Sequence, residues 1–292
     1  MVTYPTGSNI SWKGTNWIIT SSNTENVWID DDGFMHMVFK KVSGVWTGTN
    51  MEDGTSRLYG RIKLVAHSES LNLERNTTWG ICTYHAPVSG NAAEIDIEMN
   101  QWPGYDQHVW FSNHPAGIDS YPENLYYGVL SSDPYIDATD VTYIIEWTPS
   151  YIYYAVIAYD GHIILDWTTT GTATADIPNI ASYVCMCLLP LGGIYYPTVG
   201  TYFEIVLSDY EFDDMRLDAS FSTTEVNSGC AVQFLDTSTG LPSSWLWNFG
   251  DGTTSTKKNP IHKYQTTGNF TVSLSVTNAV SNDSVSQTVV VT

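Results

Sequence analysis

Basic residues are scarce in this chain, and their scarcity limits its partners. Among 292 residues, 11 are Lys or Arg and 31 are Asp or Glu, which gives a formal net charge of −20. Such a surface repels phosphate backbones and anionic membranes at long range, so we expect no nucleic-acid partner. The sequence also lacks an apolar run of about 20 residues, the length of a membrane-spanning helix, and we expect no membrane span.

Cysteine is scarce as well, which excludes a disulfide-rich scaffold. The four cysteines contain no CxxC pair of the kind found at zinc sites, and the seven histidines show no HxxxH or HxH spacing. Cys185 and Cys187 would share one face of a strand, so either could pair with Cys82 if the two strands are neighbours. The other interpretation is that these cysteines, with Cys230, are buried free thiols.

Helical periodicity is nearly absent, whereas apolar and polar residues often alternate. Alternating runs at residues 26–30, 142–147 and 271–277 predict strands. Glycine-containing turns, such as residues 30–33 and 250–252, lie between runs of this kind and can close hairpins. Many short strands joined by such turns favour an all-β fold of the sandwich or jelly-roll type.

The composition changes near residue 217, where an acidic run ends and a Ser/Thr-rich segment begins. We therefore expect two domains, residues 1–217 and 218–292. In the second, Trp247 and Phe249 would share the core face of one strand, and residues 250–252 would form a tight turn.

The segments around this turn resemble a PKD-type (polycystic-kidney-disease) repeat, whose W-x-F-G-D-G signature they contain. The resemblance implies a second, smaller immunoglobulin-like β-sandwich after the larger domain. It also implies a role as a spacer or as an attachment unit at a cell surface or matrix, and no catalysis. The matching segments are residues 232–240, 244–252, 259–264 and 268–274.

The larger domain contains one cluster of acids that a structural strand would not need. Because side chains alternate along a strand, Glu94, Asp96 and Glu98 would line one face while apolar neighbours fill the core behind them. Three like charges on one face repel one another. Glycoside hydrolysis, by contrast, needs two carboxyl groups, one ionised and one protonated, about 5 to 5.5 Å apart in retaining enzymes. On a flat strand the α-carbons of Glu94 and Glu98 would be about 13 Å apart, so strand curvature would have to bring their carboxyl groups together.

This cluster resembles the E-[IL]-D-[IV]-x(0,1)-E motif of glycoside hydrolase family 16, the β-jelly-roll endo-glycosidases. Flanking segments at residues 58–64, 143–149, 151–161 and 202–212 resemble other strands of that family in the same order. The resemblance implies a β-jelly-roll sandwich. By position, it implies that Glu94 is the nucleophile, Glu98 the general acid and base, and Asp96 an assisting carboxylate.

The substrate-binding residues are less clearly marked. Many family members have Trp shortly before the first Glu, but here residues 91–93 are Asn-Ala-Ala. A sugar-stacking wall would then come from Trp79, Trp102 or Trp110, of which Trp110 could equally lie in the core. Asn100 would lie on the same strand face as the three acids, and it is a candidate for contact with sugar hydroxyls. His114 is a weaker candidate.

We expect no required cofactor and no catalytic metal. A structural calcium ion remains an alternative, because many jelly-roll glycosidases hold one on the convex side. The acidic residues 30–32 and 213–214 are candidates, although a hairpin turn explains the first group better, since it lacks spaced calcium ligands.

The resulting hypothesis is a retaining endo-glycoside hydrolase that acts on a β-linked glucan or galactan outside the cell or at its surface. Four N-x-[ST] sequons agree with that location. The alternatives are a carbohydrate-binding or structural surface protein without turnover, and a transglycosylase.

Overall fold

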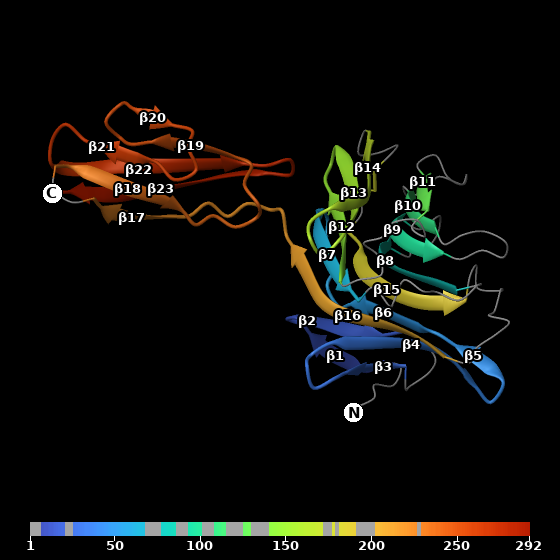
Figure 1. Ribbon diagram of the computed structural model, residues 1–292. Coiled ribbons are helices and arrows are strands. Elements are labelled where there is room, and N and C mark those ends of the chain that lie inside the picture. The colour runs from blue at the N-terminus through green and yellow to red at the C-terminus, as the bar shows by residue number, and fades with distance from the viewer. Residues whose placement is uncertain are drawn as a thin grey trace. The chain divides into compact units, whose positions relative to one another are not determined.

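The computed structural model describes most of the chain and divides it into two compact units, Met1–Phe212 and Asp213–Thr292 (Figure 1). This division lies slightly before the expected boundary at residue 217. Every named element is a strand, so the predicted all-β fold is confirmed. The described residues are 7–20, 26–67, 77–85, 93–100, 108–114, 125–129, 140–171, 177–178, 181–190, 202–226 and 229–292.

The first unit consists of two antiparallel eight-stranded sheets. In spatial order, the first sheet contains β1 (Asn9–Trp12), β2 (Thr15–Ile19), β6 (Thr49–Asp53), β15 (Tyr183–Pro190), β8 (Thr77–His85), β9 (Ala93–Asn100), β10 (His108–His114) and β11 (Leu125–Val129). The second contains β14 (Ile163–Thr170), β13 (Tyr151–Ile157), β12 (Val141–Trp147), β7 (Gly60–Ala66), β16 (Tyr202–Asp213), β4 (Met35–Val42) and β3 (Val27–Ile29), with β5 (Val45–Thr47) paired to β4.

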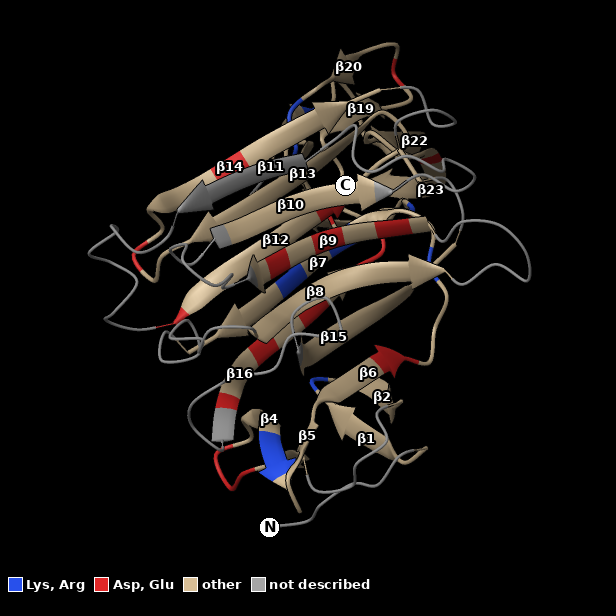
Figure 2. Cartoon of the chain, turned by 90° about the vertical axis from the view of Figure 1, so that its right-hand side faces the viewer, with Lys and Arg blue, Asp and Glu red and all other residues tan. Residues whose placement is uncertain are grey.

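One continuous core lies between these sheets. On β9, Ile95, Ile97 and Met99 are fully buried in it, as the alternation of side chains requires. The sheets therefore form the predicted sandwich. The opposite face of β9 carries its acidic residues, which appear as red bands along β9 in Figure 2.

Trp79 belongs to this core, which corrects its assignment as a sugar-stacking residue. Its side chain is 2% exposed. Its ring packs edge to face on that of Tyr143, with the ring centroids 5.2 Å apart. Trp79 follows the core parity of β8, together with Ile81, whereas Gly80 between them has the parity of the opposite face.

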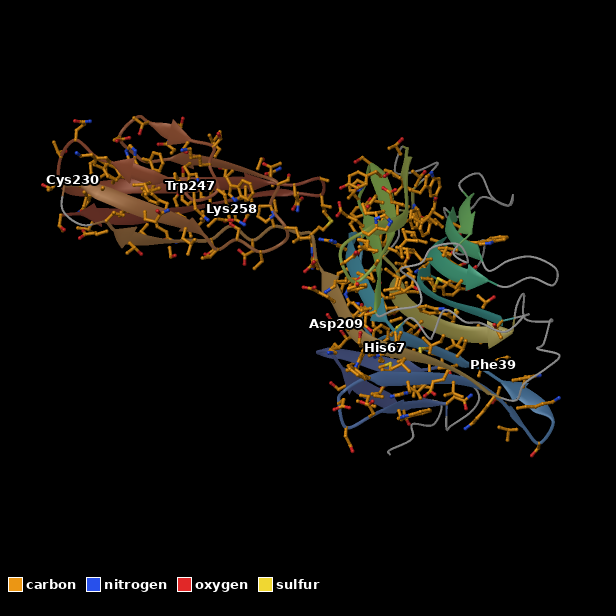
Figure 3. The ribbon with its side chains drawn as sticks, in the orientation of Figure 1. Phe39, His67, Asp209, Cys230, Trp247 and Lys258 are labelled. Carbon is orange, nitrogen blue, oxygen red and sulfur yellow. The ribbon has the colours of Figure 1, made fainter. Side chains whose placement is uncertain are left out.

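The second unit is a smaller sandwich of two sheets. One sheet contains β17 (Phe221–Glu225), β18 (Ala231–Asp236) and β21 (Ile261–Lys263), and the other contains β20 (Thr254–Ser255), β19 (Ser244–Asn248), β22 (Gly268–Thr277) and β23 (Asn282–Val291). Trp247, labelled in Figure 3, belongs to this unit and lies fully buried in its core. Its ring packs edge to face on that of Phe221. Phe249 shares that core, as predicted.

Gly250 shows why the turn after Phe249 needs glycine. Its φ is 79°, and a β-carbon there would lie 2.4 Å from the carbonyl oxygen of Thr271. A side chain would therefore be strained and would collide with β22. The indole of Trp247 donates a 2.9 Å hydrogen bond to the carbonyl of Lys257, which satisfies its buried N–H group.

Candidate active site

The three acids of β9 share one face of the first sheet and differ in exposure. Asp96 is 4% exposed, whereas Glu94 and Glu98 on either side are half-buried. Strands β8 and β10 pair with β9 on its two sides, so each acid has a defined neighbour on each strand. Across β8 and β10 respectively, these neighbours are Tyr84 and His114 for Glu94, Cys82 and Ser112 for Asp96, and Gly80 and Trp110 for Glu98.

Asp96 takes part in two side-chain hydrogen bonds. The hydroxyl of Ser112 donates to Oδ2 of Asp96 at 2.8 Å, and the Asp96 side chain is also hydrogen-bonded to Glu94. Burial raises the pKa of Asp96 well above its ordinary value, and the negative charges of Glu94 and Glu98 raise it further. Asp96 therefore keeps a proton under conditions in which an exposed aspartate would lose it.

Burial also raises the pKa of Glu94, and the nearby charge of Glu98 adds to the effect. The hydrogen bond from Asp96 acts in the opposite direction and lowers the pKa of Glu94. Of this pair, Asp96 holds the proton more tightly and donates it to the carboxylate of Glu94. The site can thus present an anionic Glu94 beside a protonated acid.

Gly80 makes room for Glu98 on the neighbouring strand. A β-carbon at Gly80 would lie 2.5 Å from the carbonyl oxygen of Ile97 and 3.2 Å from the α-carbon of Glu98. Contacts this short would displace the backbone of β9 at the acid itself. The sequence alone did not single out this glycine, because its role depends on the register of β8 against β9.

Cysteines lie beside the acids, another feature that the sequence did not reveal. The sulfur of Cys82 and carboxylate oxygens of Glu94 and Asp96 all lie within 4.8 Å of one another. A hydrogen bond to Cys185 raises the pKa of Cys82 well above its ordinary value, with burial and nearby negative charges adding to it. Burial, together with the charge of Glu98, also raises the pKa of Cys187 well above its ordinary value. The thiols of Cys82 and Cys187 therefore stay protonated at neutral pH. Cys82, Cys185, Cys187 and Cys230 are all free in this structure.

The Cys82, Glu94 and Asp96 group has the spacing of a metal site, with one soft sulfur and two hard oxygen donors. Within the described ranges no second group of three such residues is found. Both carboxylate oxygens of Asp30, a calcium candidate, have protein partners. Its Oδ1 accepts backbone N–H groups of Asp32 and Phe34, and its Oδ2 is 3.1 Å from Nε2 of His36.

The remaining predicted binding residues fall at defined positions of the sheet or outside the described part. Trp110 is half-buried and pairs with Glu98. The backbone positions of His114 and Asn100 have the same parity as the acids, with His114 opposite Glu94. Trp102 lies outside the described residues. Their contact with a substrate remains a prediction.

The fold defines a class of protein, a β-sandwich carrying a row of carboxyl groups, followed by an immunoglobulin-like module. Residues 217–292 match the family model described as PKD domain, and the C-terminal unit is a PKD domain. Collagenase ColA of Bacillus cereus is 51% identical over 49 residues, which are 17% of this chain and 5% of the collagenase. The match thus spans only a small fraction of that relative.

The first unit is similar to solved structures of a β-glucanase and a laminarinase. A Bacillus licheniformis β-glucanase is 20% identical over 62% of this chain and 81% of its own, with a TM-score of 0.47. Laminarinase from Flavobacterium sp. UMI-01 is 18% identical over 63% of this chain and 80% of its own, with a TM-score of 0.48. No helix in the described part of the chain is long and apolar enough to cross a membrane.

Proposed function

We propose that the first unit is a retaining endo-glycoside hydrolase that cleaves a β-linked glucan or galactan. The observation that carries the proposal is the grouping on β9, where a buried, proton-holding Asp96 lies between two half-buried glutamates. Glu94 and Glu98 are close enough for the charge of one to raise the pKa of the other. Acid-assisted glycoside cleavage requires one ionised and one protonated carboxyl group, and the repulsion between neighbouring carboxylates favours keeping a proton within this group.

In this mechanism Glu98, as the acid, protonates the oxygen of the leaving sugar. The carboxylate of Glu94 attacks the anomeric carbon, the bond to the leaving oxygen breaks, and a glycosyl-enzyme ester forms. Glu98, now ionised, takes a proton from water, which attacks the anomeric carbon and releases Glu94. The configuration at that carbon is inverted twice and therefore retained.

Asp96 assists Glu94 in both steps. By donating its proton in a hydrogen bond to Glu94, it favours the ionised form of the nucleophile before attack and of the leaving carboxylate afterwards. The hydroxyl of Ser112 donates a second hydrogen bond to the Asp96 carboxyl group, at Oδ2. No metal ion or cofactor is needed for these steps, although a structural calcium ion elsewhere in the chain is compatible with them.

We further propose that the protein acts outside the cell or at its surface, with the PKD domain attaching the enzyme to a surface or matrix. The proposal rests on the pairing of a PKD domain with a unit suited to polymeric sugars. Fractionating the producing cells and probing each fraction with an antibody tests the location. Recovery in the cytoplasmic fraction alone would refute it.

The activity is tested by incubation with laminarin, mixed-linkage glucan, agar and carrageenan. We expect soluble oligosaccharides from one of them, with the anomeric configuration of the new reducing end retained in early proton NMR spectra. Glu94→Gln and Glu98→Gln should each lower kcat/KM by about a thousandfold or more, because each removes a group that acts on the reacting atoms.

Glu211→Gln is the matched control, since Glu211 lies on β16 in the other sheet and its side chain is 54% exposed. It should retain full activity. Glycan binding without released oligosaccharide would instead support a non-catalytic binding protein, and longer products joined to an added acceptor would indicate transglycosylation.

A further inference from the structure

Cys82 on β8 and Cys185 on β15 occupy directly opposite positions in neighbouring antiparallel strands. Side chains at such positions lie on the same face of the sheet, and their α-carbons are about 4.5 to 5.5 Å apart. Disulfide bonds join α-carbons about 4.4 to 6.8 Å apart. The backbone of these two strands therefore already satisfies the main distance requirement of a disulfide.

The two side chains are also in contact. The thiol of Cys82 is hydrogen-bonded to Cys185, and this bond is the largest cause of the raised pKa of Cys82. Cys185 is 7% exposed and Cys82 is half-buried. Two sulfurs held in contact need only a small movement to form a bond.

Cys187 is placed differently, although it is two residues from Cys185 on the same strand. It lies opposite Gly80 on β8 and Asn50 on β6, so its relation to Cys82 is diagonal. Diagonal neighbours across antiparallel strands are about 7 to 8 Å apart, beyond the usual reach of a disulfide. The register thus separates the two pairings that the sequence left equivalent.

We propose that Cys82 and Cys185 form a disulfide bond that links β8 to β15 when the protein is oxidised. Two S–H bonds of the cysteines break and one S–S bond forms between them, and the two protons and two electrons released pass to the oxidant. A small-molecule disulfide such as oxidised glutathione suffices, and it is converted to two thiols in the exchange.

The position of this bond gives it two consequences. It closes a loop of roughly 100 residues, so in the chain-entropy account it constrains the unfolded state strongly. It also places the sulfur of Cys82, which lies within 4.8 Å of oxygens of Glu94 and Asp96, in a fixed cross-link beside the acids. The inference depends on strand register and on the contact between the two thiols, and it stands whether or not the proposed activity is found.

Refolding of the full chain with reduced and oxidised glutathione tests the proposal. Mass spectrometry after alkylation should show two alkyl groups on the chain and a further loss of about 2 Da for the two missing hydrogens, and peptide mapping should join the Cys82 and Cys185 peptides. The thermal midpoint of the first unit should rise by roughly 5 to 15 °C over the reduced form and fall again with dithiothreitol.

Cys185→Ser and Cys187→Ser form a matched pair, because they alter neighbouring positions on the same face of β15. Cys187→Ser should still form the cross-link and should still show the rise in thermal midpoint that dithiothreitol reverses. Cys185→Ser should show neither. Peptide mapping of the unmodified chain keeps the test valid if a variant does not fold. A bond between Cys82 and Cys187, or four free thiols after oxidative refolding, would overturn the proposal.

Discussion

Ser112 Oγ lies 2.8 Å from Oδ2 of Asp96, and this hydrogen bond joins β10 to the middle carboxyl group of β9. It lowers the pKa of Asp96, against the stronger effects of burial and neighbouring charges. The bond therefore orients Asp96 so that its proton is available to Glu94. This relationship makes Ser112 a positioning residue for the proposed chemistry.

Ser112→Ala should lower kcat by about tenfold, because one buried hydrogen bond to the assisting carboxyl group is lost. Steady-state kinetics on the substrate identified by the polysaccharide panel measures the effect. The control is Ser208→Ala, since Ser208 on β16 also donates a 2.8 Å hydrogen bond to an aspartate, Asp140. Equal losses in both variants would show that Ser112 has only a structural role.

Asp96→Asn should stabilise the first unit at neutral pH while impairing the proposed activity. Because burial raises the pKa of Asp96, the folded state binds a proton that the unfolded chain releases above its ordinary pKa of 3.8. As the pH rises above that value, the presence of Asp96 lowers the free energy of unfolding of the first unit. Asparagine carries no titrating proton, so the Asp96→Asn variant does not lose this free energy.

We expect a rise in thermal midpoint of about 2 to 5 °C at pH 7 that disappears near pH 3. Differential scanning calorimetry across this pH range measures it. A gain of the same size at both pH values would contradict the proposed protonation of Asp96.

The pH dependence of the proposed hydrolysis should follow Glu94. Because burial and the charge of Glu98 raise its pKa above the ordinary 4.5, Glu94 becomes protonated, and unable to attack, at a higher pH than an exposed glutamate. The acid limb of the kcat/KM profile should therefore have a midpoint above 4.5. A midpoint at or below that value would assign the limb to another group.

Gly80→Ala should lower both stability and activity. The added methyl group would lie 2.5 Å from the carbonyl oxygen of Ile97, and we expect a cost of about 1 to 3 kcal/mol in the free energy of unfolding. Urea unfolding measures this cost. Gly54→Ala is the control, because a β-carbon there meets nothing closer than 3.6 Å. If both variants behave alike, strand β9 is less constrained at Glu98 than the geometry indicates.

The PKD domain should lose stability in acid through Asp251. Partial burial alone would raise the pKa of Asp251, but hydrogen bonds from Thr253 and His262 outweigh it and lower the pKa to about 2. The folded state therefore releases this proton more readily than the unfolded chain. Ionised Asp251 therefore adds to the free energy of unfolding of the PKD domain above pH 3.8, and this contribution is lost as the pH falls towards 2.

Asp251→Asn should lower the thermal midpoint of the PKD domain by about 2 to 5 °C at pH 6, with a smaller effect near pH 2. Circular dichroism melts of the full chain at both pH values measure the difference. Glu225→Gln is the control, since the side chain of Glu225 accepts an exposed hydrogen bond from the hydroxyl of Thr292. An unchanged midpoint in Asp251→Asn at pH 6 would refute the role of this carboxylate.

Much of the architecture could be predicted from local patterns. Alternation along residues 93–100 indicated a strand with the acids on one face, and β9 has that arrangement. The signature around Trp247 and Phe249 indicated a PKD domain, because its aromatic parity and tight turn are short-range features. Trp79 was misassigned because aromatic residues serve equally in cores and in sugar-binding sites.

The sequence by itself determined which segments are strands and which face of each strand is apolar, since both follow from the two-residue period of an extended chain. Only the tertiary structure decided that Cys82, Asp96 and Ser112 occupy one row across three strands, that Gly80 lies beside Glu98, and that Cys185 rather than Cys187 faces Cys82. These relations depend on strand order and register. Side-chain periodicity is the same for every register that keeps the buried face buried, so a shift of two residues would preserve the pattern and change every neighbour.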